Sequence, residues 1–112
     1  MEVPQDLQRR FSELGGYERQ ADAYNTATIR VVAHYTAPGL GDRAVWDFYI
    51  LDYLPGTDSY LAVVHGWSTE MALVPLRALE RGDEHLYGPA TRDPEWTECS
   101  YAELKEQIGH LQ

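Results

Sequence analysis

The stretch that decides the fold is residues 45–67, VWDFYILDYLPGTDSYLAVVHGW. Residues 45–53 and residues 59–65 are rich in aromatic and β-branched side chains, which favour β-strands. The segment between them, LPGTD, has Pro55 and Gly56 at its centre, and these residue types favour a tight turn. The stretch therefore predicts a β-hairpin.

Side chains alternate between two faces along the first strand of this hairpin, because successive residues of a strand point to opposite sides. One face carries Trp46, Phe48, Ile50 and Asp52, and the other carries Asp47, Tyr49, Leu51 and Tyr53. Asp52 falls at the end of its strand, where a carboxylate reaches water, and Asp47 lies among tyrosines that tolerate partial exposure. Alternation alone therefore accounts for both acidic residues.

Helices are predicted near both ends of the chain and in its middle, over residues 4–14, 75–81 and 101–111. The first has apolar residues at spacings of three and four, which places them on one helical face. Pro75 suits the first turn of the second helix. Ser100 and Glu103 form a capping box at the start of the third.

Further strands extend the hairpin into a sheet. Residues 70–74 form a strand after the hairpin, and a short edge strand is predicted near residues 92–96. Residues 28–35 alternate, and the side chains on one face of this strand are Ile29, Val31, Ala33 and Tyr35. Residues 36–43 are predicted to be a loop, as are residues 17–27, with a short helical turn.

These elements predict a single domain over residues 1–112 with an α+β fold. It is an antiparallel β-meander of about four strands, with an N-terminal helix, a short middle helix and a C-terminal helix.

Composition excludes several classes of function. The chain has 18 acidic and 9 basic residues and a net charge of −9. Such a surface repels phosphate groups, so we expect no direct binding to nucleic acid and none to membranes. The polar N-terminus is unlike a secretory signal, and the single cysteine, Cys99, excludes an internal disulfide. We therefore expect a cytoplasmic protein.

Residues that could carry chemistry give only weak signals. The four histidines lack the spacing of metal ligands, and no phosphate loop or nucleophile motif occurs, so we expect no metal, no cofactor and no enzyme. His34, His65 and Asp47 would make a proton-transfer group if neighbouring strands brought them together. The alternation of side chains favours a different interpretation. In it, each of the three residues is exposed to solvent separately, on the polar side of a sheet. Cys99 is expected to be an inert thiol, because acidic residues crowd the start of the helix that follows it.

Aromatic residues are the more informative feature. Eight tyrosines and three tryptophans are many for this length, and short helices cannot cover aromatic rings on both faces of a sheet. Some rings should therefore remain exposed as a face that binds a partner. The candidates are Tyr35, Trp46, Tyr49, Tyr53, Tyr60 and Trp67.

Several motifs carry a resemblance to a known family. The matching residues are Trp46, Asp47, Tyr49 and Ile50, then Gly66, Glu70, Leu76, Leu79 and Glu80, and finally Arg92, Asp93 and Trp96. Over residues 28–104 the chain resembles a family of small uncharacterised proteins common on plasmids, integrative elements and phages. Ala72 and Pro94 depart from the family pattern. The resemblance implies a compact cytoplasmic domain in a mobile-element setting, and it brings no established activity.

The charged residues among these matches suggest a structural ion pair. Either Asp47 with Arg92 or Glu70 with Arg92 would lock the sheet.

Three functions are consistent with the sequence. The preferred one is a non-enzymatic accessory protein that binds another protein, or a second copy of itself, through the aromatic face. The second is an acidic mimic of nucleic acid that blocks a restriction or modification enzyme, with a row of carboxylates from Glu80, Asp83, Glu84, Asp93, Glu95 and Glu98. The third is a small hydrolase that uses His34, His65 and Asp47.

Overall fold

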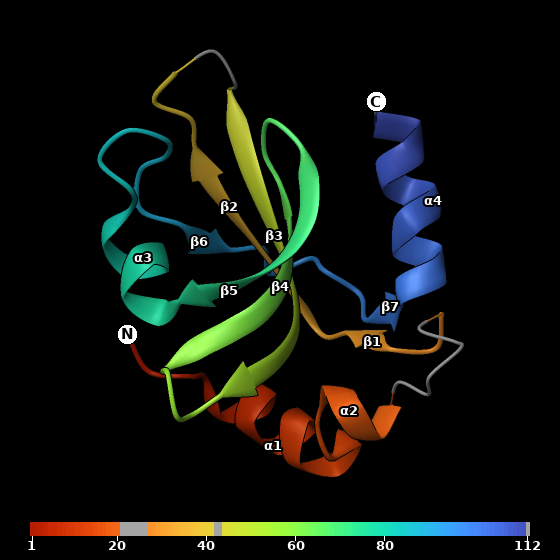
Figure 1. Cartoon of the computed structure of the whole chain (residues 1–112). Coiled ribbons are helices and arrows are strands. Elements are labelled where there is room, and N and C mark those ends of the chain that lie inside the picture. The colour runs from red at the N-terminus through yellow and green to blue at the C-terminus, as the bar shows by residue number, and fades with distance from the viewer. Residues whose placement is uncertain (21–26, 42–43, 112) are drawn as a thin grey trace.

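A computed structural model of the chain describes residues 1–20, 27–41 and 44–111 (Figure 1). Within these residues the fold has a five-stranded antiparallel sheet, a second sheet of two strands, and four helices. The strands are β1 (Arg30–Val31), β2 (Ala33–Pro38), β3 (Val45–Leu54), β4 (Ser59–His65), β5 (Thr69–Pro75), β6 (Thr91–Arg92) and β7 (Cys99–Ser100). The helices are α1 (Gln5–Leu14), α2 (Tyr17–Gln20), α3 (Leu76–Arg81) and α4 (Tyr101–Leu111). The predicted α+β fold is confirmed.

Successive strands pair to form the meander that the sequence predicts. The strand order in the large sheet is β5-β4-β3-β2-β6. The hairpin of β3 and β4 aligns Tyr53 with Tyr60 and Asp47 with His65. The predicted edge strand is present as β6 beside β2, but it ends at Arg92 rather than near residue 96. Pro94 lacks the backbone N–H that a longer ladder would need.

The two faces of the large sheet build two hydrophobic cores. On the first face, helices α1 and α3 pack over side chains that include Trp46, Phe48, Ile50, Tyr60 and Val64. On the second face, α4 and the β1–β7 pair help enclose a core of Ile29, Val31, Tyr49, Leu51, Val63, Cys99, Leu104 and Ile108. Figure 1 shows α4 standing beside the sheet, so it covers only part of this face.

A β-bulge in β3 changes the faces that the sequence predicts. The register between β3 and β4 shifts between Ile50 and Asp52, so Leu51 is an extra residue in β3. Beyond the bulge, Tyr53 packs against the first core, while Asp52 opposes Leu61, which packs against the second. The predicted faces of Asp52 and Tyr53 are therefore exchanged.

The strand predicted over residues 28–35 is divided in two. β1 pairs with β7, whereas β2 pairs with β3, and Val32 lies between them. The alternation is interrupted at Val32. Ile29 and Val31 therefore enter the second core, whereas Val32, Ala33 and Tyr35 enter the first. The prediction that Ile29, Val31, Ala33 and Tyr35 share one face is wrong. β2 also continues to Pro38, into the predicted loop, of which residues 42–43 lie outside the described residues.

Helix ends follow the capping signals. α1 ends at Gly15, whose φ is 77° and whose amide donates to the Phe11 carbonyl at 3.0 Å. The predicted capping box starts α4, because the amides of Glu103 and Ser100 donate to each other's side chains at 3.2 and 3.1 Å. α2 supplies the helical turn predicted after α1, and residues 21–26 of that segment are not described. In the part of the chain that is described, every helix is too short or too polar to cross a membrane.

Candidate functional site

His34 lies at the centre of a polar cluster on the second face of the sheet. Its Nε2 is 2.8 Å from Oδ1 of Asp47 on β3, and its Nδ1 is 3.0 Å from Oδ2 of Asp93, which follows β6. The imidazole stacks on the ring of Tyr49, with centroids 4.7 Å apart and planes 10° apart, and Trp96 lies against it at 5.4 Å. The histidine side chain is 13% exposed, so carboxylates and aromatic rings replace most of its water.

Two carboxylate partners require a proton on each ring nitrogen. A neutral imidazole has one N–H, whereas an imidazolium has two and donates to both carboxylates. Burial lowers the pKa of His34, but the hydrogen bonds to Asp47 and Asp93 outweigh burial, and the net pKa shift is upward. The same bond to His34 is the main cause that lowers the pKa of Asp93. In this arrangement both nitrogens are engaged, and neither is left to take a proton from a substrate.

The histidines and Asp47 are closer together than alternation suggests. We expected His34, His65 and Asp47 to be wetted separately, and this is wrong for His34 and Asp47, which are hydrogen-bonded. The β2–β3 register makes them diagonal neighbours on one face. His65 lies opposite Asp47 on β4, and its Nδ1 is 2.6 Å from Oγ1 of Thr69. No group of three His, Cys, Asp or Glu side chains among the described residues is arranged to hold a metal ion.

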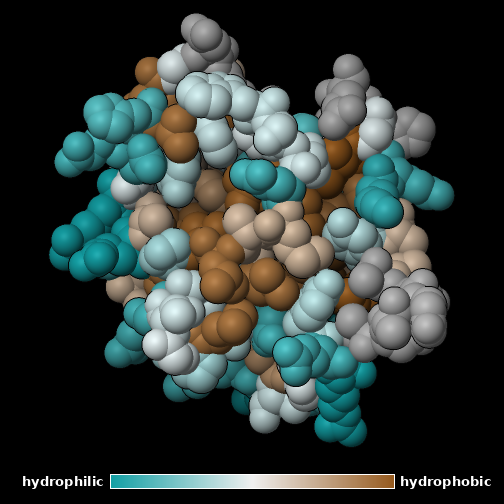
Figure 2. All heavy atoms as spheres, in the orientation of Figure 1, coloured by the Kyte–Doolittle hydropathy of each residue, from teal (hydrophilic) through white to brown (hydrophobic). Residues whose placement is uncertain are grey.

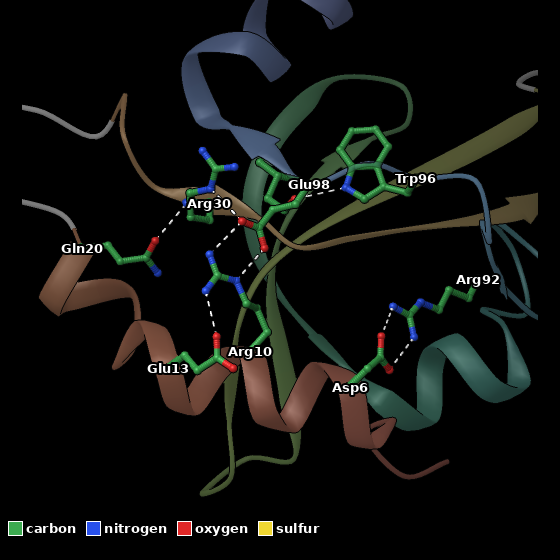
Figure 3. Close-up of polar contacts among 9 residues, drawn as sticks. Asp6, Arg10, Glu13, Gln20, Arg30, Arg92, Trp96 and Glu98 are labelled. Atoms are coloured by element: carbon green, nitrogen blue, oxygen red, sulfur yellow. Dashed lines mark hydrogen bonds and ion pairs between the residues drawn. The ribbon is translucent and has the colours of Figure 1, made fainter.

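A second polar cluster ties the segment after β6 to α1 and β1 (Figure 3). Glu98 accepts hydrogen bonds from Nε and Nη2 of Arg10, at 2.8 and 2.9 Å, and from Nε of Arg30, at 2.8 Å. The bond from Arg10 is the largest cause that lowers the pKa of Glu98, and the bond from Arg30 adds to it. Next to this cluster, Trp96 donates its Nε1–H to the Val31 carbonyl at 3.1 Å. The segment is therefore held by both ionic and neutral contacts.

Arg92 makes a bidentate ion pair with Asp6 of α1, at 3.0 and 2.7 Å (Figure 3). The predicted pairs of Arg92 with Asp47 or with Glu70 are therefore wrong. Arg92 is the register partner of Tyr35, whose side chain is on the first face with α1, whereas Asp47 is on the second face. Glu70 belongs to β5, at the opposite edge of the sheet from β6.

Four of the six carboxylates in the predicted acidic row are engaged within the molecule. Glu80 pairs with the N-terminal ammonium group at 2.7 Å, and Asp83 accepts two backbone amides of its own turn. Asp93 and Glu98 belong to the two clusters described above. The remaining, exposed members are Glu84 and Glu95. These contacts reduce the number of carboxylates that could project together, and the acidic row stays a prediction.

The six aromatic residues predicted as a binding face do not form one surface. The buried members are Tyr35, Trp46, Tyr49 and Tyr60, which are divided between the two cores. Tyr53 is half-buried against the first core, and Trp67 is 67% exposed. The predicted aromatic face is wrong because the rings pack against one another and against α1 inside the fold.

Two exposed apolar side chains lie next to each other on one face of β5, at the edge of the sheet. Met71 is 39% exposed and Leu73 is 49% exposed. Both lie on the second face, because their register partners on β4, Val63 and Leu61, belong to the second core. Leu61, Met71 and Leu73 are called the apolar strip below. Figure 2 shows apolar side chains gathered at the middle of one face of the molecule, where Figure 1 shows β5 crossing in front of β4.

An acidic hollow adjoins the apolar strip. Its volume is about 320 Å³, and Leu61, Asp52 and Glu18 contribute to its lining. Sequence reasoning missed the strip, although alternation alone would place Met71 and Leu73 on one face. The predicted meander already places this strand at the edge of the sheet, so the signal for an exposed strip was present in the sequence.

Searches among protein-family models, curated proteins and solved structures found no match to this chain. The resemblance to the mobile-element family stays a prediction.

Proposed function

We propose that this chain is a non-enzymatic protein-binding module, an accessory factor that holds a partner protein on its apolar strip. The observation that carries the proposal is the exposure of Met71 and Leu73, at 39% and 49%, next to Leu61 at the edge of the sheet. Adjacent apolar side chains on a surface are typical of interaction sites. Because each of these side chains is already more than half buried, covering the rest stabilises a complex by about 1 kcal/mol per side chain.

The charge of the molecule favours a basic partner. The net charge is −9, and two carboxylates, those of Asp52 and Glu18, line the hollow beside Leu61. Asp52 already accepts the backbone amides of Tyr17 and Tyr53, at 2.9 and 2.8 Å. We therefore expect a partner segment whose apolar side chains cover the strip and whose lysine or arginine residues lie over Glu18 and the acidic surface around it. Complementary charges would speed the encounter and make the binding weaken as salt is added.

The polar clusters support binding rather than catalysis as the function. His34 donates both ring N–H groups to carboxylates, and Arg10 and Arg30 are both engaged by Glu98. These contacts join distant parts of the chain, which is a structural task. The cytoplasmic location, which is expected from the sequence, and the mobile-element setting, which the resemblance implies, are both part of this proposal.

The proposal is tested with a photo-crosslinking amino acid placed at position 73 and, as a control, at position 40. Leu40 is also an exposed apolar residue, at 55%, but it is not part of the apolar strip. In cells of the source organism, position 73 should crosslink to a defined protein other than a second copy of this chain, and position 40 should not.

The captured protein is then purified and its affinity measured for the wild type and for two matched variants. Leu73→Asp should weaken binding at least tenfold, because a carboxylate would have to be desolvated in the interface, whereas Leu40→Asp should leave it unchanged. Equal effects of the two variants, or crosslinking at both positions, would contradict the proposal.

A further inference from the structure

We propose that β5 pairs with β5 of a second copy of this chain, antiparallel and centred on Ala72, so that two five-stranded sheets join into one. This inference goes beyond the proposed function, because it concerns the backbone of the edge strand rather than the side chains that would hold another protein. The strand order places β5 at the end of the large sheet, with β4 as its neighbour among the described residues (Figure 1).

Two hydrogen bonds show which backbone groups of β5 face the open edge. The amide of Leu76 donates to the Asp58 carbonyl, and the amide of Gly66 donates to the Ser68 carbonyl, both at 3.0 Å. Backbone groups in an antiparallel ladder alternate between its two sides, so the even-numbered residues of β5 bond to β4. The N–H and C=O groups of the odd-numbered residues therefore point outward; these residues are Thr69, Met71 and Leu73.

The outward N–H and C=O groups of one β5 can bond to those of a second copy when a two-fold axis passes through Ala72. In that register Met71 lies opposite Leu73 of the second copy, and the two residues exchange both of their backbone bonds. The symmetric pair does the same, which gives about four ladder hydrogen bonds at the centre. The Thr69 amide then reaches the carbonyl of Pro75 of the second copy. Pro75 has no N–H, so the ladder ends there.

The side chains are compatible with the same register. On the second face, the exposed side chains of Met71 and Leu73 would cover each other across the new strand pair. Glu70 would lie opposite Val74, and the two copies of Glu70 would be about 13 Å apart along the strands, beyond the screening length of about 8 Å at physiological salt. Ala72, a small residue, sits on the axis, where the two chains approach most closely.

β5 has few of the features that usually protect an edge strand, and its one charged residue is Glu70. Its ladder with β4 has no register shift, it contains no lysine, and its one proline is its last residue. Proteins commonly block exposed edges with bulges, lysines or internal prolines. The joined sheet would place two apolar strips side by side.

Sedimentation and light scattering over a range of protein concentrations test the dimer, and a proline substitution tests its ladder. Met71→Pro removes an N–H that faces outward and leaves the bonds to β4 intact, whereas Met71→Ala keeps that N–H. We expect the wild type and Met71→Ala to dimerise, and Met71→Pro to stay monomeric with an unchanged circular dichroism spectrum. A monomeric wild type at all concentrations, or a dimer of Met71→Pro, would overturn the proposal.

A cysteine on the axis tests the register. Facing residues of a non-hydrogen-bonded pair lie about 4.5 Å apart, within the range of a disulfide, so Ala72→Cys should give a covalent dimer under mild oxidation. Thr69→Cys should not, because position 69 faces position 75. A dimer in which Thr69→Cys crosslinks instead would overturn the proposed register.

Salt separates this inference from the proposed function. Two copies that each carry a net charge of −9 repel each other, so the dimer should tighten as salt rises, whereas binding of a basic partner should weaken. A monomer that still binds its partner through Leu73 would overturn only the inference. A dimer with no partner at position 73 would overturn only the proposed function.

Discussion

The imidazole of His34 and the carboxylate of Asp47 are hydrogen-bonded at 2.8 Å across neighbouring strands, although the other nitrogen of the same ring is already held by a second carboxylate. This geometry favours the cationic form of His34 in the folded protein, and the pKa of His34 is raised above its ordinary value. In the unfolded chain the pKa returns to about 6.5. The stabilisation is therefore complete below that value and is lost as pH rises through the folded pKa.

His34→Gln should remove this pH dependence. A glutamine cannot donate to both carboxylates as a cation, so we expect a loss of about 3 kcal/mol in the free energy of unfolding below the ordinary histidine pKa, and a smaller loss at alkaline pH. Urea unfolding at several pH values measures both. His85→Gln is the matched control, because His85 is exposed and no carboxylate contacts its ring nitrogens among the described residues. If the unfolding free energies of the two variants depended on pH in the same way, a charged His34 that donates to both Asp47 and Asp93 would be refuted.

Glu98→Gln should destabilise the protein more than Glu13→Gln, although both glutamates contact Arg10. Glu98 also binds Arg30 and is partly buried, so its loss leaves two guanidinium groups without their shared carboxylate. We expect a cost of about 2 kcal/mol for Glu98→Gln and less than about 0.5 kcal/mol for the exposed Glu13→Gln. Thermal and urea unfolding near neutral pH compare them. The pKa of Glu98 is lowered, so the difference should shrink as pH falls through the folded pKa.

Local patterns predict the elements of this fold well, because each depends on neighbouring residues. The β3–β4 hairpin, the helix after Pro75 and the capping box at Ser100 all follow from signals within a few positions. Two irregularities cannot be predicted from such local signals. They are the extra residues Leu51 and Val32. At each, one additional residue exchanges the faces of the side chains beyond it, and the alternation of residue types hides the exchange because both faces are apolar.

The sites depend on which distant segments become neighbours. His34 meets Asp93, 59 residues away, only because β6 adds to β2 and the chain then turns back over the second face. Arg92 pairs with Asp6 rather than Asp47 because its strand position points it to the first face. Arg92 and Asp47 both take part in contacts between distant segments, but their partners follow from strand order and face.

Gly66→Ala should destabilise the protein because there is no space for a methyl group. A Cβ at this position would overlap the ring of Trp46, which is itself held between Tyr87 at 5.3 Å and Trp67 at 5.9 Å. We expect a loss of about 1–3 kcal/mol in unfolding free energy. Near-ultraviolet circular dichroism should also change, because the tryptophan environment is disturbed.

Gly109→Ala is the counterpart of that substitution. Gly109 lies in α4 and has open space around its Cα, so alanine should stabilise the helix by about 0.5–1 kcal/mol. The two variants add the same methyl group with opposite expected signs. A loss of stability in both would mean that the packing around one of the two glycines is not as described.

Cys99 should be unreactive in the folded protein, even though it lies just before the N-terminal end of α4, where a helix dipole favours a thiolate. The side chain is buried in the second core, and burial is the largest cause that raises the pKa of its thiol, followed by the charge of Glu103. Alkylation then requires local opening, so iodoacetamide should react with native Cys99 on the order of a hundredfold more slowly than with the urea-unfolded chain. Glu103→Gln keeps an acceptor for the capping box and removes the charge. It should therefore change the rate only slightly if burial dominates, whereas a large acceleration would show that the carboxylate, and not burial, protects the thiol.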